Sequence, residues 1–495
     1  MKNNSVIKPI TAILVAALFL AFCYDMCTES LRTSSYLFLI VCIAVTVVVF
    51  RNDFPKTAVF YTMLTGMLLK LSYVLYTPVW CRQHDVIDFG AGEGHAAYIE
   101  YILANKSLPD FDPRSVWAFF QPPLHHIVSA FWMWINIRLG LSENHVHKNV
   151  QILPLVYMCF LMLIVYLICK ELNMRKGGTI VTMLIVSFHP IYILMSGSIN
   201  NDALSVMLTV LAIYVSIIWY MYPTTGKIAL LGLVIGLAMF AKLSSALIAP
   251  PVAILMFYKI KKDTGNLKHK AKVISYALEL AVFAVIVFPI GLFWTIRNKM
   301  LFDMPVNYIP DVGEAVERSG FFPTILDVGT RSPFLYMKSN GFEYDEYNLI
   351  LATLKSSLFG EGDFGHMPFV ITILGWILLV ASVAVIIFQV TATVRTIFDK
   401  EAGPDNGIKI FLLSTVITFV VGYTAFALTG ANLSAMDFRY SAAAVSVLSV
   451  FAGLWYDRLV LLAKMKTSYA VIASSAVFAA ASGVFYIMAG LMQEL

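Results

Sequence analysis

The sequence predicts an all-α integral membrane protein, and its composition and the spacing of its apolar stretches carry that prediction. Of the 495 residues, 59% are hydrophobic and only 13% are charged, and the mean hydropathy is +0.78. A soluble domain averages about a quarter charged residues. Apolar stretches near the length of about 20 residues that a helix needs to cross a bilayer recur along the chain. This composition excludes a soluble globular enzyme, a disordered chain and a nucleic-acid binder.

Thirteen apolar stretches are predicted to span the membrane within one polytopic domain, 1–495. The region 228–259 is too long for one span, and because Lys242 and the Pro250–Pro251 pair interrupt it, two short helices are expected there. No small-residue cleavage site follows the first stretch, which is therefore interpreted as a retained span. The predicted spans are 9–24, 35–50, 57–78, 150–170, 178–196, 203–222, 228–241, 244–259, 273–295, 367–391, 408–428, 441–460 and 468–492.

The distribution of lysine and arginine predicts which side of the membrane each loop faces. Six lysines fall between Lys259 and Lys272, and such basic loops stay in the cytoplasm. Alternating spans then place the N-terminus in the cytoplasm. The two longest loops, 79–149 and 296–366, lie outside the cell membrane in this topology.

Both long outer loops contain stretches with helical periodicity. Apolar residues recur at helical spacing in 97–103 and in 345–355. We expect these stretches to form helices that lie in the membrane interface. Loops of this length are usually functional or disordered, and these are too apolar for disorder. A mere connecting role is the alternative.

The start of the first outer loop gathers groups that can transfer protons. The segment 83–95 contains His84, Asp85, Asp88, Glu93 and His95, with glycines that permit tight turns. A carboxylate at the membrane surface can take the proton of a hydroxyl group. Asp85 and Asp88 are therefore candidate catalytic residues, and a solvated polar loop is the alternative.

The later part of the same loop contains the string Gln121-Pro-Pro-Leu-His-His126. A proline pair suits the first turn of a helix, so a helix is predicted to begin here with Gln121 at its mouth. His125 and His126 then lie on its first turns. A plain helix start without further function is the alternative.

These two strings resemble those of the GT-C glycosyltransferases of family 39, which include the protein O-mannosyltransferases and the lipid A aminoarabinose transferases. Asp85-Val-Ile-Asp-Phe-Gly90 is similar to the Asp-Glu-x-His-Phe-Gly string of that family, and Gln121-Pro-Pro-Leu124 to its His-Pro-Pro-Leu or Lys-Pro-Pro-Leu string. The match implies that Asp85 is the catalytic aspartate. Val86 and Asp88 depart from the family pattern, which leaves the class of acceptor open.

Shorter similarities continue along the chain. Ser198–Leu204, Ala241-Lys242, Trp294–Asn298, Lys355–Glu361 and Phe438-Arg-Tyr440 resemble family strings in the same order. The resemblance implies a polyprenyl-phosphate sugar as donor, because nucleotide sugars are scarce outside the cytoplasm. The acceptor is then a glycan, a lipid-linked glycan or a protein, and Asp85 acts as general base in an inverting single displacement.

The remaining site residues follow from the charge that such a reaction develops. Lys242, Arg297 and Arg439 are candidates to stabilise the leaving phosphate. Alternatives are a lysine that reaches the membrane surface, a solvated arginine and an ion pair of Arg439 with Asp437. The candidate substrate-binding residues are His84, His95, Gln121, His125 and Asp202.

Three further groups have less specific signals. Asp202 is expected to cap a helix in any case, and Lys70, inside a span, is left open between function and reaching the surface. Asp110-Phe-Asp112 has the form of a metal-binding Asp-x-Asp string but is too short to trust. Adjacent histidines on a helix point about 100° apart, so no metal or other cofactor is expected.

Two other functions compete with the transferase. A secondary transporter or lipid flippase would place charged groups at broken helices in the middle of the membrane, where the sequence offers Lys70, Glu279 and the break at Lys242. A scaffold protein would use the long loops only to bind partners. The concentration of ionisable groups in the outer loops favours the transferase.

Overall fold

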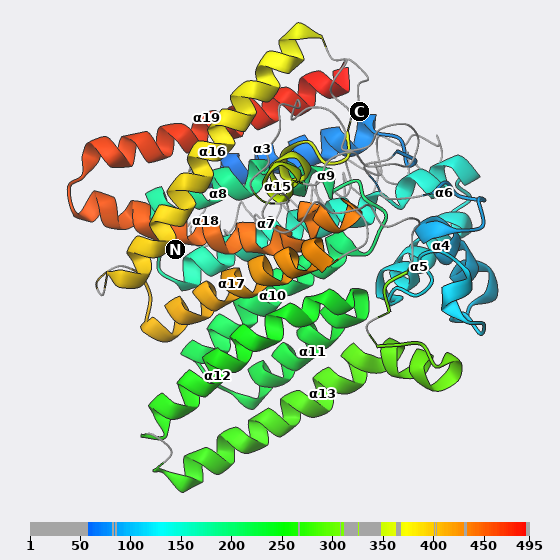
Figure 1. Ribbon diagram of the computed structural model, residues 1–495, viewed down its shortest axis with the longest axis horizontal. Helices are drawn as coiled ribbons and strands as arrows, with labels where there is room; N and C mark the ends of the chain where they lie inside the picture. Colours follow the sequence, from blue (N-terminus) through cyan, green and yellow to red (C-terminus); the bar gives the residue numbers. More distant parts are fainter. Residues whose placement is uncertain are drawn as a thin grey trace, which may run out of the picture.

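The computed structural model confirms an all-α membrane fold (Figure 1). The structure describes residues 58–81, 84, 87–265, 268–306, 308–310, 325, 348–362, 368–399, 401, 403–429 and 433–491, and every regular element in these ranges is a helix. The predicted spans 9–24 and 35–50 lie outside the described residues. So does Asp85, and so does almost all of 311–347.

Nine helical segments of the described part are long and apolar enough to cross a membrane. Two shorter apolar helices, α8 (Lys176–Phe188) and α11 (Thr225–Ala241), fall on two further predicted spans. The count of thirteen spans stays a prediction. The nine segments are built on α3 (Ala58–Tyr76), α7 (Ile152–Glu171), α10 (Asp202–Met221), α12 (Ala249–Asp263), α13 (Lys270–Phe302), α16 (Phe369–Phe398), α17 (Asn406–Thr429), α18 (Ala442–Leu461) and α19 (Met465–Leu491).

The two ends of the helical bundle differ in what they carry. Three short helices, α4 (Gly94–Asn105), α5 (Leu124–Arg138) and α6 (Glu143–Asn149), gather at one end, which we call the site end (Figure 1). The end of α12, the start of α13 and the connection between them together contain six lysines; they lie at the opposite end, which we call the lysine end. The separation of the basic loop from the first long loop agrees with the alternation predicted from lysine counts.

Local sequence signals in the first long loop predict its helices correctly. The periodic stretch 97–103 lies inside α4, and α5 begins directly after the Pro122–Pro123 pair. A separate hydrophobic core holds these helices together. It contains Tyr98, Phe119 and Met133, and Trp294 of α13 packs into it, so the loop is a folded unit attached to the bundle. Of the periodic stretch 345–355, residues 349–355 lie in a helix, α15 (Leu349–Leu358), and residues 345–347 lie outside the described residues.

The predicted break near Lys242 is confirmed. Helix α11 ends at Ala241, a short 3-10 helix, η3, spans Leu243–Ile248, and α12 follows. Pro250 and Pro251 lie in the first turn of α12, where proline is tolerated because the backbone N–H has no helical partner. The prolines therefore start a helix, and the break itself is at Lys242.

A second break separates α8 from the short helix α9 (Pro190–Leu194). Pro190 cannot donate a backbone hydrogen bond, so carbonyls at the end of α8 need other donors. The fully buried Lys70 donates to the Ser187 carbonyl at 2.8 Å, and the Ser482 hydroxyl donates to the Phe188 carbonyl at 2.6 Å. Lys70 thus does not reach the membrane surface, and it closes the end of a neighbouring helix.

Candidate active site

The segment 197–202, between α9 and α10, connects the parts of the site end. Its backbone carbonyls accept hydrogen bonds from two loop side chains: Gln151 donates to Gly197 at 3.2 Å, and His125 donates to Ile199 at 2.8 Å. Its last two side chains, Asn201 and Asp202, contact residues that come later in the chain. This segment is almost completely buried. Its packing therefore holds it in place, together with the side chains that bond to it.

Two cations converge on Asp202. The Lys242 ammonium pairs with one carboxylate oxygen of Asp202, and Nε of Arg439 lies 3.5 Å from the other. The side chain of Asp202 is 5% exposed, and those of Lys242 and Arg439 are 13% and 12% exposed. Two predicted phosphate ligands and one predicted substrate ligand, which lie between positions 202 and 439 of the sequence, therefore meet in one buried cluster.

The residues after α17 complete this cluster. Lys242 Nζ lies 4.6 Å from the ring centre of Tyr440, a cation–π contact. The Asp437 carboxylate accepts a hydrogen bond from the Arg439 backbone N–H at 2.8 Å and lies 3.8 Å from Arg439 Nε. Burial raises the pKa of the Asp437 carboxyl to about 6. The predicted Arg439–Asp437 pair exists, but it is buried and belongs to a larger network.

A small polar cavity adjoins the cluster. Asp202, Ser205, Ser245, Arg439 and Tyr440 are among its lining residues, and its volume is about 20 Å³. That volume has room for about one water molecule. A larger ligand at these cations must therefore displace side chains or approach from another direction.

Gln121 reaches the same cluster through Asn201. The Asn201 amide donates to the Ala241 carbonyl at 2.7 Å and lies 3.4 Å from the Gln121 side-chain oxygen. Because Ala241 directly precedes Lys242, Asn201 ties the mouth of α5 to the end of α11. The structure thus brings together four predicted site residues: Gln121, Asp202, Lys242 and Arg439.

The prediction that Asp202 caps its helix is wrong. Helix α10 begins at Asp202 itself with Asn201 as N-cap, and the Asn200 side chain accepts the hydrogen bond from the Asp202 backbone N–H at 3.0 Å. The side chain of Asn200 thus accepts the backbone N–H at the start of α10. The Asp202 carboxylate is left to pair with Lys242 and Arg439. The cost of burying that carboxylate is offset by two cations rather than by helix N–H groups.

Asp85 lies outside the described residues, but its neighbour His84 is buried and held on both ring nitrogens. The His84 Nδ1 lies 3.0 Å from the Val79 carbonyl, and Nε2 lies 3.2 Å from the Tyr73 hydroxyl. Gly197 makes room for the ring, since a Cβ there would lie 2.6 Å from His84 Nε2. Burial lowers the pKa of His84 to about 4, so the ring is a neutral anchor for the chain just before Asp85.

The other predicted histidines are buried in the first loop. His95 Nδ1 lies 2.9 Å from His126 Nε2, and the His126 ring stacks on Tyr98 at 4.3 Å between ring centres. Burial lowers the pKa of His125 to about 4 and that of His126 well below its ordinary value. The structure therefore gives His95, His125 and His126 packing roles, and His125 also contacts the segment 197–202 through the Ile199 carbonyl.

The remaining carboxylates of the first loop face solvent. Asp88 and Glu93 are exposed, and the Asp88 carboxylate accepts a hydrogen bond from the next backbone N–H at 2.9 Å. Asp112 caps a short 3-10 helix and binds Arg114, while Asp110 accepts from Tyr101 at 3.1 Å. Among the described residues, no group of three or more histidine, cysteine, aspartate or glutamate side chains is placed to hold a metal ion.

Arg297 lies apart from the other two predicted phosphate ligands. Its guanidinium donates to the Pro109 carbonyl and to the Asn298 side chain, and it lies over the ring of Trp294 at 4.9 Å. These contacts fasten the end of α13 to the first loop. Within the described part of the chain, Arg297 has no contact with Lys242 or Arg439.

Three contributors to this end of the molecule were not predicted as site residues: Gln151, Asn201 and Tyr440. Asn201 and Tyr440 stand in strings noted for their family resemblance, so adjacency to a charged candidate was an available signal. Nothing local singles out Gln151, because its role depends on contacts with distant segments.

Part of the sequence is similar to a known protein family. Residues 123–290 match the family model of the dolichyl-phosphate-mannose-protein mannosyltransferases. This range contains the segment 197–202 and Lys242. The resemblance to GT-C glycosyltransferases of this type is confirmed. No curated protein sequence matches the chain.

Solved structures of GT-C proteins share the fold. ArnT from Cupriavidus metallidurans, bound to undecaprenyl phosphate, superimposes with a TM-score of 0.51 at 14% identity, over 88% of this chain and 78% of that one. The archaeal oligosaccharyltransferase AglB from Archaeoglobus fulgidus, in complex with an inhibitory peptide and a dolichol-phosphate, gives 0.51 at 16% identity. The match covers 89% of this chain and 56% of AglB, so the chain spans just over half the length of that protein. At such identities the likeness establishes the GT-C fold.

Proposed function

We propose that this GT-C chain transfers a sugar from a polyprenyl-phosphate sugar to an acceptor at its site end. One observation carries the proposal: Lys242 and Arg439 converge, nearly buried, on the carboxylate of Asp202. Two cations held in a low-dielectric site stabilise an anionic leaving group far better than cations in water. ArnT and AglB, which share the fold, were solved with lipid phosphates bound.

The leaving phosphate would take over the hydrogen bond that Lys242 donates to Asp202 and the ion pair of Arg439 with Asp202. Arg439 has the planar donor fork that suits phosphate oxygens, and Lys242 adds a point charge. Asp202 holds both cations in place until the phosphate arrives. Gln121, just before the start of α5, would donate a hydrogen bond from its amide nitrogen to a sugar hydroxyl, while Asn201 holds the Gln121 side-chain oxygen.

Asp85 is proposed as the general base. It follows the anchored His84, in the loop that covers the site end, and its carboxylate would take the proton of the acceptor hydroxyl as that oxygen attacks the sugar carbon. The bond from the sugar to the phosphate breaks on the opposite face, so the anomeric configuration inverts. The acceptor is a glycan, a lipid-linked glycan or a protein.

The proposed orientation places the N-terminus in the cytoplasm and the site end outside the cell membrane. The six lysines of the opposite end support it, because basic loops remain in the cytoplasm. The runner-up function, a transporter or flippase, would use a broken helix within the membrane. The break between α8 and α9 is such a feature, but Lys70 and Ser482 already satisfy its freed carbonyls.

The test uses the full chain in nanodiscs with a panel of undecaprenyl-phosphate hexoses and pentoses and with undecaprenyl phosphate alone. We expect the isosteric substitution Asp85→Asn to lower the rate of sugar transfer about 100- to 10,000-fold. The variant should still bind lipid phosphate, as measured by native mass spectrometry. Full transfer activity in Asp85→Asn would overturn the assignment of the base, and Asp88→Asn is the next variant. Failure of the wild type to bind any lipid phosphate would overturn the transferase proposal itself.

A further inference from the structure

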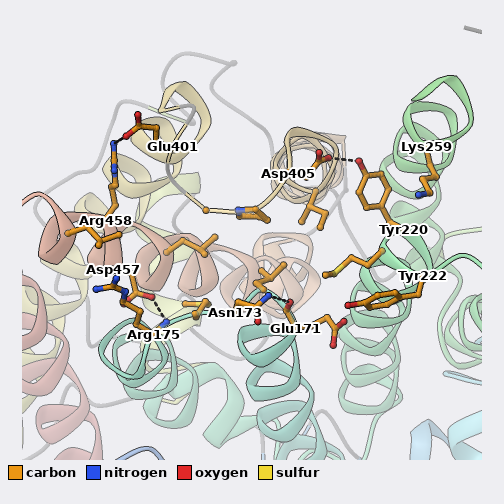
Figure 2. Close-up of a pocket in the computed structure, with 18 of the residues that line it drawn as sticks. Glu171, Asn173, Arg175, Tyr220, Tyr222, Lys259, Glu401, Asp405, Asp457 and Arg458 are labelled. Carbon is orange, nitrogen blue, oxygen red and sulfur yellow. Dashed lines mark hydrogen bonds and ion pairs between the residues drawn. The ribbon is translucent and has the colours of Figure 1, made fainter. Parts of the chain in front are cut away.

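The lysine end contains a cavity of about 610 Å³, and several of its charged lining groups are held by other groups of the protein (Figure 2). Arg458 pairs with Glu401 at 2.8 Å, and the Asp405 carboxylate accepts a hydrogen bond from the Tyr220 hydroxyl. Asp457 accepts two backbone N–H groups at the start of α8, at 2.7 and 2.9 Å. Charged side chains at this end therefore hold one another and the start of a helix in place.

The backbone that carries Arg439, on the side of the proposed reaction, is held by uncharged hydroxyl groups of other helices. This backbone, residues 436–439, which we call the arginine segment, leads into the short 3-10 helix η5 (Phe438–Ser441). From it the guanidinium reaches Asp202, with Arg439 Nε 3.5 Å from the carboxylate. Because a shift of the backbone moves the guanidinium with it, the contacts that fix the arginine segment also fix the cation.

Ser356 of α15 holds the start of η5 through both functions of its hydroxyl group. The oxygen accepts a hydrogen bond from the Phe438 backbone N–H at 2.9 Å, and the hydroxyl donates to the Ala352 carbonyl within α15 at 2.6 Å. The first N–H groups of a helix have no helical partner. Asp437 accepts one of them, from Arg439, at 2.8 Å. The buried Ser356 accepts the other, so a residue of the second long outer loop completes the arginine segment.

Tyr423 of α17 fixes the peptide at the beginning of the arginine segment. Its hydroxyl donates to the Met436 carbonyl at 2.6 Å, and its oxygen lies 2.9 Å from the hydroxyl oxygen of Thr353, which belongs to α15. Leu349, Tyr423 and Met436 also belong to a small hydrophobic core of their own. Helix α15, α17 and the arginine segment are therefore packed together as one unit.

We propose that Ser356 is a positioning residue of the transferase, which holds Arg439 in place for the leaving phosphate by accepting the Phe438 backbone N–H. This proposal rests on the proposed function, and it gives a role to the string Lys355–Glu361, which was noted above only for its family resemblance. Without the hydroxyl, a partly buried N–H loses its acceptor, and the arginine segment shifts to find another. The guanidinium then leaves the geometry that a phosphate oxygen needs, since hydrogen bonds weaken steeply with angle.

The effect of Ser356 is confined to one of the two cations. Lys242 contacts Asp202 and the Tyr440 ring from the break after α11, and neither contact involves α15. Removal of the Ser356 hydroxyl should therefore lower the contribution of Arg439 to phosphate binding and leave that of Lys242 in place. In a protein that lacks the Arg439 guanidinium, the same removal should have no effect on phosphate binding, because the residue acts through that group.

The experiment measures undecaprenyl-phosphate binding by native mass spectrometry, and transfer kinetics in nanodiscs, for the full chain with Ser356→Ala, Arg439→Gln or both. We expect Ser356→Ala to weaken binding about tenfold, the effect of one weakened charge-assisted contact, and to leave the acceptor KM unchanged. Added to Arg439→Gln, it should weaken binding no further. Ser382→Ala in α16 is the matched control and should bind as the wild type does. Ser382 is also buried and donates to the carbonyl four residues before it at 2.6 Å, and in the described part of the chain it accepts no backbone N–H.

Two results would overturn this inference alone. One is unchanged binding by Ser356→Ala, and the other is an equal loss in the wild-type and Arg439→Gln backgrounds, which would indicate a general loosening of the structure. A wild type that binds no lipid phosphate would overturn the proposed function together with this inference. Tyr423→Phe provides a second variant if Ser356→Ala does not fold, as judged by its melting temperature. It removes the hydrogen bond to the Met436 carbonyl and should weaken binding in the same Arg439-dependent way.

Discussion

Two ion pairs, one from each end of the bundle, differ in their exposure to solvent. At the site end, Lys242 and Asp202 are 13% and 5% exposed beside a cavity of about 20 Å³. At the lysine end, Lys262 and Asp405 are 53% and 38% exposed beside a cavity of about 610 Å³. Exposed pairs contribute about 0–1 kcal/mol, whereas breaking a buried pair leaves an uncompensated charge. The difference indicates that the Lys242–Asp202 pair keeps its charges in spite of their desolvation cost.

The most severe test of this comparison removes the central carboxylate. Asp202→Asn leaves Lys242 and Arg439 without their shared partner, so we expect a loss of about 3–5 kcal/mol of unfolding free energy. Asp303→Asn is the control, because its pair with Lys299 is exposed to solvent and its loss should change stability little. Unfolding in detergent, followed by tryptophan fluorescence, measures both. Equal losses would show that burial does not distinguish the two pairs.

A second test compares the two lysines directly in the reaction. Lys242→Met should lower transfer about 100- to 1,000-fold, since it removes one of two groups that stabilise the leaving phosphate. Lys262→Met, from the exposed pair of the lysine end, should change transfer less than about twofold. Initial rates at saturating donor and acceptor separate the two results. A Lys242→Met enzyme with near-normal rates would remove this residue from the proposed phosphate site.

Helix packing at the lysine end provides a third test. A Cβ on Gly178 would lie 2.4 Å from the Gly453 carbonyl oxygen, so α8 and α18 are in backbone contact there. Gly178→Ala should cost about 1–3 kcal/mol through overpacking. Gly226→Ala, where a Cβ meets nothing within 4 Å, should be neutral or slightly stabilising. A stable Gly178→Ala variant would mean that α8 and α18 move apart easily.

The smallest expected effect is a change in pH dependence. His84 and His125 have pKa values lowered to about 4 by burial, so the unfolded chain binds more protons and stability falls as the pH drops from about 6.5 toward 4. Asp437, whose pKa burial raises to about 6, acts oppositely. Its contribution is full below about 4 and is lost as the pH rises through 6.

Asp437→Asn removes that opposing contribution. The variant should therefore lose melting temperature more steeply than the wild type between pH 6.5 and about 4.5. Thermal unfolding of both proteins in one detergent over this range measures the difference. Parallel pH profiles would show that Asp437 does not change its protonation on unfolding.

Much of the fold follows from local sequence, and the reason is physical. Apolar stretches long enough to cross a bilayer must form helices there to satisfy their backbone groups, which is why α3, α7 and α10 coincide with predicted spans. Pro122–Pro123 starts α5 because its fixed backbone suits a first turn, and the periodicity of 97–103 anticipates α4. The distribution of lysines also predicted that the basic loop and the first long loop lie on opposite sides of the membrane.

The tertiary structure alone decided which of these residues meet. Asp202 was predicted as a cap, but Asn201 is the N-cap residue and Asn200 accepts the Asp202 backbone N–H, so the Asp202 carboxylate pairs with Lys242 and Arg439. Arg297, equally basic and in an equally family-like string, binds the first loop instead. Local periodicity determines a helix because its hydrogen bonds join residues four apart. A buried ion pair depends on how helices from distant parts of the chain pack, and no local pattern records that.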